Sequence, residues 1–495
     1  MLQGNSPLLA HRLQNASLLI LSLVFLPLDT LILIVSLLVS KVLPNEPKSN
    51  REATQRRAGF RRRTVLVTGV GMTKGLVLAR LFHAAGHDVL GADFEPDGAL
   101  VCGRVSSSLK RFYRLQKPNP KSGAAPYIQN LLDIVLREKV ELWISCSGVA
   151  SAVEDGMAKE VVEARTDCRA IQFDVKTTQT LHEKHSFMEH TKAIGLTVPE
   201  THEITSRAAV QSILRNAPPG RKYIMKTIGV DDSVRGDLTL LPKKSDLETS
   251  EHIARLRISP DSPWILQEFI QGKEYCTHSL VVRGHVKAFV ACPSAELLMH
   301  YQALPIESAL SQAMMEFTKT YAASGGEGFS GHLSFDFMVW DENAAGPRNV
   351  VLYPIECNPR AHTAVALFNG TATAMVDAYL SVLENSHSQR TDTRIVRPIT
   401  NDKYYWTGHD LVTRAILPTV SFLTLSGASI WDLSQSYTTF LSHLFTWRDG
   451  TYVLWDPLPW WWLYHVYWPM RFWGCIRRGR KWSRINVSTA KMFEC

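Results

Sequence analysis

The sequence has 495 residues, of which 45% are hydrophobic and 20% are charged. This composition excludes a disordered or fibrous chain and suits two or three packed units. The net charge is +8, but basic residues gather in runs at 51–63 and 477–484, beside apolar or aromatic segments. That placement favours a lipid headgroup surface as partner and argues against nucleic acid. The eight cysteines form no CxxC pair, which predicts reduced thiols in a cytosolic domain.

Residues 17–43 form one apolar stretch that is long enough to cross a bilayer as a helix. Pro27 and Asp29 interrupt the stretch, so two forms of anchor stay open: a single span, or a shallow hairpin within one leaflet. One central Asp costs about 3 kcal/mol, which the apolar residues together outweigh. Residues 1–16 would be a tail, and the basic residues 44–63 a linker at the cytosolic membrane surface.

The segment after this linker has a strand–helix–strand pattern. TVLVTGV at 64–70 predicts a buried strand, a glycine turn and a helix follow, and DVLGADF at 88–94 predicts a second strand. A helix over 131–138 and a buried strand over 141–148 continue the pattern. We therefore expect a Rossmann-like, doubly wound α/β domain over residues 64–175.

The next segment, residues 176–385, is expected to be a separate α+β domain. Residues 177–195 predict a helix, and later segments alternate as antiparallel strands do. These strand candidates are 222–229, 263–270, 274–284, 285–292, 331–340 and 350–358. Residues 386–495 would form a C-terminal extension with an apolar helix at 411–425 and a Trp-rich segment at 456–473. The aromatic side chains suit a membrane interface, which we favour, or the wall of an apolar substrate pocket.

The most informative polar group lies in YPIECNPRAH at 353–362. In a strand, Glu356, Asn358 and Arg360 alternate onto one face, which places a carboxylate, an amide and a guanidinium side by side. Asp336, in the preceding FDF segment, is expected to face the same site. Such oxygen ligands suit Mg²⁺, and the guanidinium suits phosphate. The alternative is a solvated strand edge, but the surrounding residues are apolar, and unpaired buried charges are costly.

Two lysines fit a nucleotide. Lys226 lies in the apolar strand YIMKTIG, where an ammonium group needs an anion, and Lys184 begins a helical pattern in HEKHSFMEHTKAIG. The segment ILQEFIQGKEY at 265–275 is a candidate adenine strand, in which the backbone near Glu268 can pair with the base and Glu274 can bond the ribose. Taken alone, each of these segments is more often a surface lysine or an ordinary amphipathic strand.

The order of these pieces resembles the ATP-grasp superfamily over residues 64–385. The βαβ domain is followed by EKHSF, IMK, QEFIQGKE, FDF and IECNPR. By resemblance to carbamoyl-phosphate synthetase and related ligases, the residues would contact the ATP phosphates (Lys184, Lys226), adenine through the backbone (Glu268, Phe269), ribose (Glu274) and Mg²⁺ or Mn²⁺ (Asp336, Glu356, Asn358). Arg360 and Lys226 would be the catalytic residues, and His362 is a candidate contact for the acceptor substrate.

The sequence departs from the superfamily pattern at two places. The loop over the phosphates is usually glycine-rich, but GVDDSVRGD at 229–237 has two glycines and two consecutive aspartates. Arg235 in this loop would close over the γ-phosphate, or else be an ordinary solvated arginine. The anchor, YYWTGHDL at 404–411 and the aromatic tail look like ATP-grasp enzymes of fungal secondary-metabolite clusters. A more distant similarity is to ligases that attach glycine to a cyclohexenone in mycosporine synthesis.

The resemblance implies an ATP-dependent ligase. ATP would phosphorylate a carboxylate or an enolised carbonyl, and an amine, such as that of an amino acid, would displace phosphate, with release of ADP. The expected partners are small-molecule acid and amine substrates, membrane lipid and other enzymes of a secondary-metabolite pathway. The expected location is the membrane, with the catalytic domain in the cytosol.

Two other classes of protein compete with this prediction. A nicotinamide-dependent oxidoreductase would explain GVGMTKG at 69–75 followed by Asp93. However, the glycine spacing is GxGxxxG. This class of enzyme would also leave the polar residues of the segment 353–362 unexplained. A membrane-associated nucleotide-binding module without catalysis is the other alternative. The complete set of lysines, metal ligands and arginine argues against it.

Overall fold

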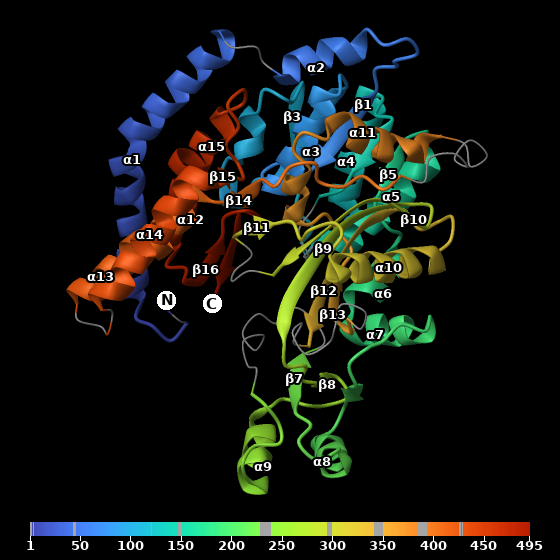
Figure 1. Cartoon of the computed structure of the whole chain (residues 1–495), viewed down its shortest axis with the longest axis vertical. Helices are drawn as coiled ribbons and strands as arrows, with labels where there is room; N and C mark the ends of the chain where they lie inside the picture. The colour runs from blue at the N-terminus through green and yellow to red at the C-terminus, as the bar shows by residue number, and fades with distance from the viewer. Residues whose placement is uncertain are drawn as a thin grey trace.

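The computed structural model describes the whole chain except residues 1, 3, 43–45, 120, 147–150, 228–238, 295–298, 341–349, 385–393, 425–426 and 428. Figure 1 shows the long helix α1 along one side, beside the C-terminal helices. A lobe that contains β7, β8, α8 and α9 projects from the lower end of the body in Figure 1. The fold is mixed α/β, with one parallel sheet and several antiparallel ones.

The first sheet is parallel and has the strand order β3-β2-β1-β4-β5. Its strands are β1 (Thr64–Thr68), β2 (Asp88–Phe94), β3 (Arg111–Leu115), β4 (Leu142–Ile144) and β5 (Arg169–Ile171). Helices α3 (Thr73–Ala84), α4 (Ala125–Glu138) and α5 (Ala152–Arg165) connect them, together with the short turns η1 (Pro96–Gly98) and η2 (Cys102–Val105). Val65, Leu66 and Val67 in the central strand β1 are fully buried, as expected for a sheet covered on both faces. The predicted Rossmann-like sheet is confirmed.

Two antiparallel sheets follow, as predicted. The larger has the order β10-β9-β12-β13, built from β9 (Lys273–Val282), β10 (His285–Pro293), β12 (Gly331–Val339) and β13 (Leu352–Asn358). Helices α6 (Val175–His182), α7 (Lys184–Ala193), α10 (Ala309–Ser324) and α11 (Ala372–Leu380) accompany it, with the turns η5 (Thr363–Phe368) and η6 (Ser381–Leu383). The smaller sheet, β6-β8-β7, lies in the projecting lobe with α8 (Arg207–Asn216) and α9 (Asp246–Arg255). Its strands are β6 (Thr201–Ile204), β7 (Tyr223–Thr227) and β8 (Trp264–Glu268).

The segment 177–195, predicted as one helix, contains two. Helix α6 ends at His182, and Glu183 is the N-cap of α7. The Glu183 carboxylate accepts hydrogen bonds from the backbone N–H groups of His185 and Ser186, at 2.8 and 2.7 Å. A side chain that bonds these N–H groups stabilises a new helix start. As a consequence, Lys184 is the first residue of a helix.

The C-terminal region contains helices and two small sheets. One sheet has the order β11-β14-β15, and the other pairs β16 with β17. The strands are β11 (Tyr301–Gln302), β14 (Lys403–Tyr405), β15 (Arg448–Asp449), β16 (Trp482–Asn486) and β17 (Lys491–Glu494). The helices are α12 (Thr407–Asp410), η8 (Leu411–Ile416), α13 (Leu417–Leu423), α14 (Ile430–Thr446), α15 (Leu458–Trp462), η9 (Leu463–Tyr467) and α16 (Trp468–Arg478). The largest hydrophobic core joins side chains of this region to β1, α3, β9 and β10.

Part of the predicted basic linker, residues 44–63, is helical. This part forms helix α2 (Glu46–Gln55), which packs at the end of α3. Arg51 donates hydrogen bonds to the carbonyl oxygens of His83 and His87, at 2.7 and 2.9 Å, and Gln55 donates to Gly86 at 2.9 Å. These bonds satisfy carbonyl groups that the end of α3 leaves without a helical partner.

The N-terminal apolar segment is one helix, α1 (Leu8–Val42), which is long and apolar enough to cross a membrane. It continues through Pro27 without a break, so the hairpin alternative is wrong, and residues 8–16, predicted as a tail, belong to the helix. Proline removes one backbone donor and often kinks a helix. On both sides of Pro27, side chains of α1 form hydrogen bonds with the C-terminal region.

A row of polar side chains on α1 makes these contacts. Asn15 Oδ1 accepts from Trp482 Nε1 at 2.9 Å, and Ser22 Oγ donates to the carbonyl of Tyr464 at 2.9 Å. Asp29 Oδ2 lies 2.8 Å from His465 Nε2, and the hydroxyl groups of Ser36 and Tyr452 lie 2.7 Å apart. The opposite face of α1 carries exposed apolar side chains such as Leu23, Leu31 and Leu38. The polar face of α1 is therefore the docked face.

Candidate functional site

Four elements bring the predicted phosphate and metal residues together. Lys184 begins α7, Lys226 lies near the end of β7, Asp336 lies in β12, and Glu356 and Asn358 lie at the end of β13. Asp336 and Glu356 are direct partners in the register of β12 and β13. Directly opposed residues in an antiparallel pair lie about 5 Å apart. The two carboxylates therefore share one side of the sheet.

Hydrogen bonds and an ion pair connect this group. Asn358 Nδ2 donates to Asp336 Oδ2 at 3.2 Å and to Glu356 Oε1 at 3.1 Å. Lys184 Nζ lies 3.8 Å from Glu356 Oε2. The structure thus places the three predicted metal ligands and one predicted phosphate ligand within one cluster.

Lys226 faces the same space. Its ammonium group donates to Gln267 Oε1 at 2.7 Å. Burial and, to a smaller extent, the charge of Lys184 lower the pKa of Lys226 to about 8, although Glu356 and Glu274 oppose this shift. Two lysines near a pair of carboxylates form a cluster of mixed charge, which suits a polyanion bound together with a cation.

The two carboxylates have opposite tendencies to ionise. Burial and the neighbouring charge of Glu356 raise the pKa of Asp336 well above its usual value. Burial also opposes ionisation of Glu356, but the Lys184 ammonium and hydrogen bonds from Asp336 and Asn358 lower the pKa of Glu356 below its usual value. A divalent cation would supply the positive charge that lets both groups ionise, so this pair fits Mg²⁺ or Mn²⁺.

Asn358 is oriented differently from a metal ligand. Its amide nitrogen points to the two carboxylates, and its oxygen Oδ1 accepts a hydrogen bond from Arg360 Nη2 at 3.1 Å. To coordinate a cation, the amide would have to turn by half a rotation, which exchanges its oxygen and nitrogen. Arg360 follows β13 directly and is tied to Asn358 by a second hydrogen bond, from its backbone N–H to the Asn358 carbonyl at 2.8 Å.

In the predicted adenine strand, two backbone N–H groups already have partners. The N–H groups of Glu268 and Phe269 donate to the carbonyls of Glu200 and Lys222, each at 2.8 Å. A base contact by these two residues would therefore have to use their carbonyl oxygens. Glu274 is exposed at the start of β9, where its carboxylate accepts from Ser294 Oγ at 2.7 Å. Its position leaves the ribose contact a prediction.

The last two predicted site residues are His362 and Arg235. His362 is buried, and its ring accepts a hydrogen bond from the backbone N–H of Ala364 at 3.3 Å, as N-cap of η5. Burial and the charge of Arg360 hold the pKa of His362 well below its usual value, so the ring is neutral. This arrangement favours a structural role for His362, in which its ring fixes the backbone that follows Arg360. Arg235 lies outside the described residues.

The glycine turn between β1 and α3 has a structural cause. Gly69 has a φ of 76°, and a Cβ on Gly75 would lie 2.3 Å from the Gly69 carbonyl oxygen, so both positions require glycine. The N–H of Gly71 donates to Asp93 Oδ2 at 2.6 Å. One carboxylate oxygen of Asp93 therefore already accepts a hydrogen bond from its own domain. This hydrogen bond argues against the contact between Asp93 and a ribose that a dinucleotide-binding enzyme would need.

Lys74, next to this turn, is a residue that the sequence analysis did not single out. It is the second residue of α3, at the edge of the parallel sheet where the strand order reverses, and it is only 1% exposed. Burial and, to a smaller extent, the charge of Arg360 lower its pKa to about 7. Ligands of doubly wound folds bind at this edge of the sheet. The signal in the sequence was the lysine in a glycine turn after the first strand.

The structure also contains a cavity of about 1940 Å³. It lies between α1, α3 and the C-terminal region, and its lining includes Phe25, Val77, Tyr405, Trp460 and Trp482. Among the described residues, none of the predicted nucleotide or metal residues lines it. Aromatic side chains of the C-terminal region therefore form the wall of an apolar cavity, while Trp431 and Trp473 are exposed.

Comparison with known proteins gives distant structural similarity only. No protein-family model matches the sequence, and no curated protein matches it. The chain is similar to N5-carboxyaminoimidazole synthetase from Staphylococcus aureus, at 14% identity over 65% of this chain and 78% of that chain, with a TM-score of 0.45. It is similar to L-amino acid ligase from Bacillus licheniformis (12% identity, 64% and 69% coverage, TM-score 0.41) and to biotin carboxylase from Campylobacter jejuni (14%, 66% and 72%, TM-score 0.46). These values by themselves assign no function.

Proposed function

We propose that this protein is an ATP-grasp ligase, which uses ATP and Mg²⁺ to join a carboxylate, or an enolisable carbonyl, to an amine in secondary metabolism. One observation carries the proposal: Lys184 contacts Glu356 at 3.8 Å, and Glu356 lies beside Asp336 and Asn358. A lysine at a helix start, opposite paired carboxylates, is an arrangement for holding phosphate and a divalent cation.

The residues of this cluster divide the work of phosphoryl transfer. Lys184 and Lys226 hold the phosphates, and Lys226 is protonated below its pKa of about 8. Asp336 and Glu356 would hold Mg²⁺, which when bound neutralises charge on the phosphates. Arg360 stabilises the charge that develops on the transferring group. Phosphoryl transfer requires mainly such positioning and charge, with little covalent chemistry from the protein.

The substrate carboxylate would lie on the other side of Arg360. Lys74 and Arg360 are near enough that each charge disfavours the other, and an anion between them would relieve this repulsion. A carboxylate held there would have one oxygen directed to the phosphate site. Its activation as an acyl phosphate, followed by attack of an amine, would release phosphate and form the C–N bond.

We also propose that α1 attaches the enzyme to the cytosolic surface of a membrane without crossing it. The docked contacts extend from Asn15 to Ser36, which is about 30 Å of helix at about 1.5 Å per residue. Arg471 of α16, which packs against α1, lies 3.4 Å from Asp97 of the first domain. A spanning α1 would therefore have to draw α16 and the body into the bilayer. Lying in the surface exposes only its apolar face to lipid.

The test is turnover by the full chain, purified in detergent, with ATP, Mg²⁺ and paired panels of carboxylic acids and amino acids. ADP and phosphate, with a conjugate found by mass spectrometry, would support the proposal. Glu356→Gln should slow turnover at least about a hundredfold, whereas Glu251→Gln, a change of an exposed glutamate of α9, should not affect turnover. Release of AMP and pyrophosphate, or turnover that is undiminished in Glu356→Gln, would overturn the proposal.

A further inference from the structure

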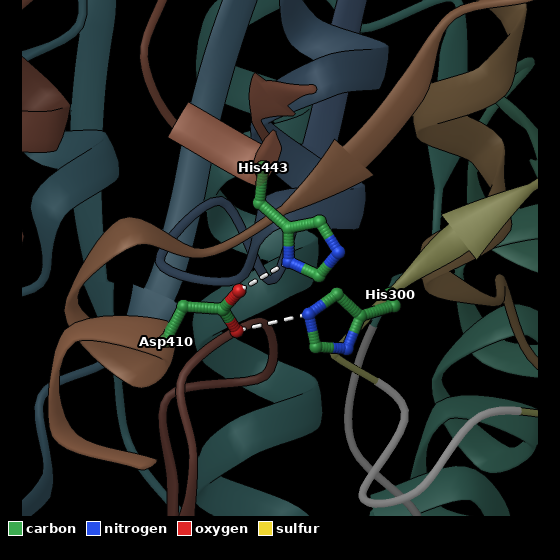
Figure 2. A group of neighbouring side chains, drawn as sticks. All are labelled: His300, Asp410 and His443. Carbon is green, nitrogen blue, oxygen red and sulfur yellow. Dashed lines mark hydrogen bonds and ion pairs between the residues drawn. The ribbon is translucent and has the colours of Figure 1, made fainter. Parts of the chain in front are cut away.

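Three polar side chains converge in a place that the proposed reaction does not use. His300 directly precedes β11, Asp410 ends α12, and His443 lies in α14. Figure 2 shows both imidazole rings directed at the single carboxylate of Asp410. His300 lies more than a hundred positions before Asp410 in the chain, and His443 comes from a third segment, so the fold and not the local sequence brings the three side chains together.

The three side chains are close enough together to bind one ion. His443 Nδ1 lies 2.6 Å from Asp410 Oδ2, and His300 Nε2 lies 2.9 Å from Asp410 Oδ1. The three potential ligand atoms, one from each residue, all lie within 4.8 Å of one another. Bonds of about 2.0–2.2 Å from imidazole nitrogen and carboxylate oxygen to a single Zn²⁺ ion fit within this spacing.

The contact between His300 and Asp410 has poor hydrogen-bond geometry. Asp410 is completely buried, and His300 Nε2 and Asp410 Oδ1 are 2.9 Å apart, but within the part of the chain that the structure describes neither atom makes a hydrogen bond of acceptable geometry. An unsatisfied buried polar atom costs about 1–3 kcal/mol. A cation placed between the lone pairs of these two atoms would satisfy both at once.

We propose that His300, Asp410 and His443 bind a first-row divalent metal ion, with Zn²⁺ as the best match to two imidazoles and one carboxylate. These are borderline ligands that Zn²⁺ accepts in tetrahedral sites, whereas Mg²⁺ prefers oxygen ligands alone. Three protein ligands leave one position for water. The site is separate from the proposed Mg²⁺ pair of Asp336 and Glu356.

One nearby charge opposes the metal. Arg414 Nε lies 3.9 Å from Asp410 Oδ2, and its positive charge weakens cation binding without blocking the two histidines. This opposition makes a second test available, because Arg414→Gln should tighten Zn²⁺ binding. In a purely hydrogen-bonded His–Asp–His network, the same change would have no effect on metal affinity.

The metal would hold together the segments that form part of the wall of the apolar cavity. Tyr405 in β14 and Trp447 after α14 line that cavity, and the Trp447 ring centroid lies 4.6 Å from that of His443. A bond from the metal to each of the three segments would fix β11, α12 and α14 relative to one another. Metal binding to the folded state alone stabilises it by mass action.

The experiment measures zinc in the full chain purified in detergent without chelator. Elemental analysis should find about one Zn²⁺ per chain, and EDTA should lower the unfolding temperature, with recovery on adding Zn²⁺ alone. His300→Gln and His443→Gln should each weaken Zn²⁺ binding at least about a hundredfold and remove the effect of EDTA. His465→Gln is the matched control, because His465 contacts one carboxylate, Asp29, at 2.8 Å; it should retain zinc.

Two outcomes would overturn the proposal. The first is wild-type protein that is folded and binds no Zn²⁺ after metal is supplied, which needs no variant to interpret. The second is equal zinc content in wild type, His300→Gln and His443→Gln. Glu356→Gln should keep its zinc while it loses turnover, so failure of this site and failure of the proposed ligase activity are distinguishable.

Discussion

Arg80→Met removes a buried ion pair that joins α3 to the C-terminal region. Arg80 Nε lies 2.8 Å from Asp456 Oδ2, and the other guanidinium nitrogens donate to the carbonyls of Thr451 and Asp456, at 2.9 and 2.8 Å. The two side chains are 6% and 1% exposed. Methionine fills much of the same space without charge. The variant therefore leaves the Asp456 carboxylate buried without its counter-ion.

We expect this change to lower the free energy of unfolding by about 3 kcal/mol, the low end of the range of about 3–5 for breaking a buried pair. The low end applies because Ser106 Oγ and the Ser107 N–H still donate to Asp456, at 2.6 and 2.8 Å. Arg80→Met with Asp456→Leu should recover most of the loss, since no charge remains buried. Arg63→Met is the control: Arg63 and Glu141 are 26% and 27% exposed, and such pairs contribute about 1 kcal/mol or less.

The loss should also depend on pH. Burial raises the pKa of Asp456, but Arg80 and the bonds from Ser106 and Ser107 outweigh burial and hold the pKa below its usual value. The pair's contribution is therefore present above the ordinary Asp pKa of about 3.9 and is lost as the pH falls through the lower folded-state value. In Arg80→Met the pKa of Asp456 rises, so the carboxyl protonates earlier on acidification and the loss shrinks toward pH 4.

The assay is urea unfolding followed by tryptophan fluorescence at pH 7 and at pH 4.5. If Arg80→Met costs no more than Arg63→Met at pH 7, the pair does not hold α3 to the C-terminal region. An equal cost at both pH values would refute the assigned role of the Asp456 charge.

Three further predictions concern the site and the anchor. ATP affinity should fall as the pH rises above about 8, where Lys226 loses its proton, and Lys226→Arg should remove this dependence; flat wild-type binding from pH 7 to 9.5 would contradict the phosphate role. Glu356→Gln should slow phosphate release at least about a hundredfold and raise the Mg²⁺ concentration needed; an unchanged Mg²⁺ titration would exclude Glu356 as a ligand. Replacing the exposed Leu23, Leu31 and Leu38 by Ser should abolish flotation with vesicles, since each buried leucine contributes about 1.5–3 kcal/mol; undiminished flotation would place the membrane contact elsewhere.

The local pattern of the sequence was enough to predict several of the strands and the polar residues that share a face of β13. Buried runs such as TVLVT in β1 carry their own strand signal, because a strand covered on both faces is apolar throughout. Glu356 and Asn358 are two positions apart in one strand, so strand geometry alone places them on one face. The convergence of Lys184 on this pair agrees with the motif order, although the roles of these residues stay predictions.

Other features depended on partners that lie far away in the chain. Asn15, Ser22, Asp29 and Ser36 recur every seven residues, a period that puts them on one face of a helix. Nothing local shows that this face docks on the C-terminal region. In the same way, Lys74 is an unremarkable lysine until burial places it beside Arg360.

The sequence by itself determined many of the strands and helices, and which polar residues share a strand face, because both follow from periods of two and 3.6 residues along the chain. The tertiary structure alone decided what each face meets. The meeting of His300, Asp410 and His443, the pairing of Arg80 with Asp456 and the docking of α1 all join distant segments. Such contacts arise from the packing of whole helices and strands, and the local periodicity of the sequence does not show which of them pack together.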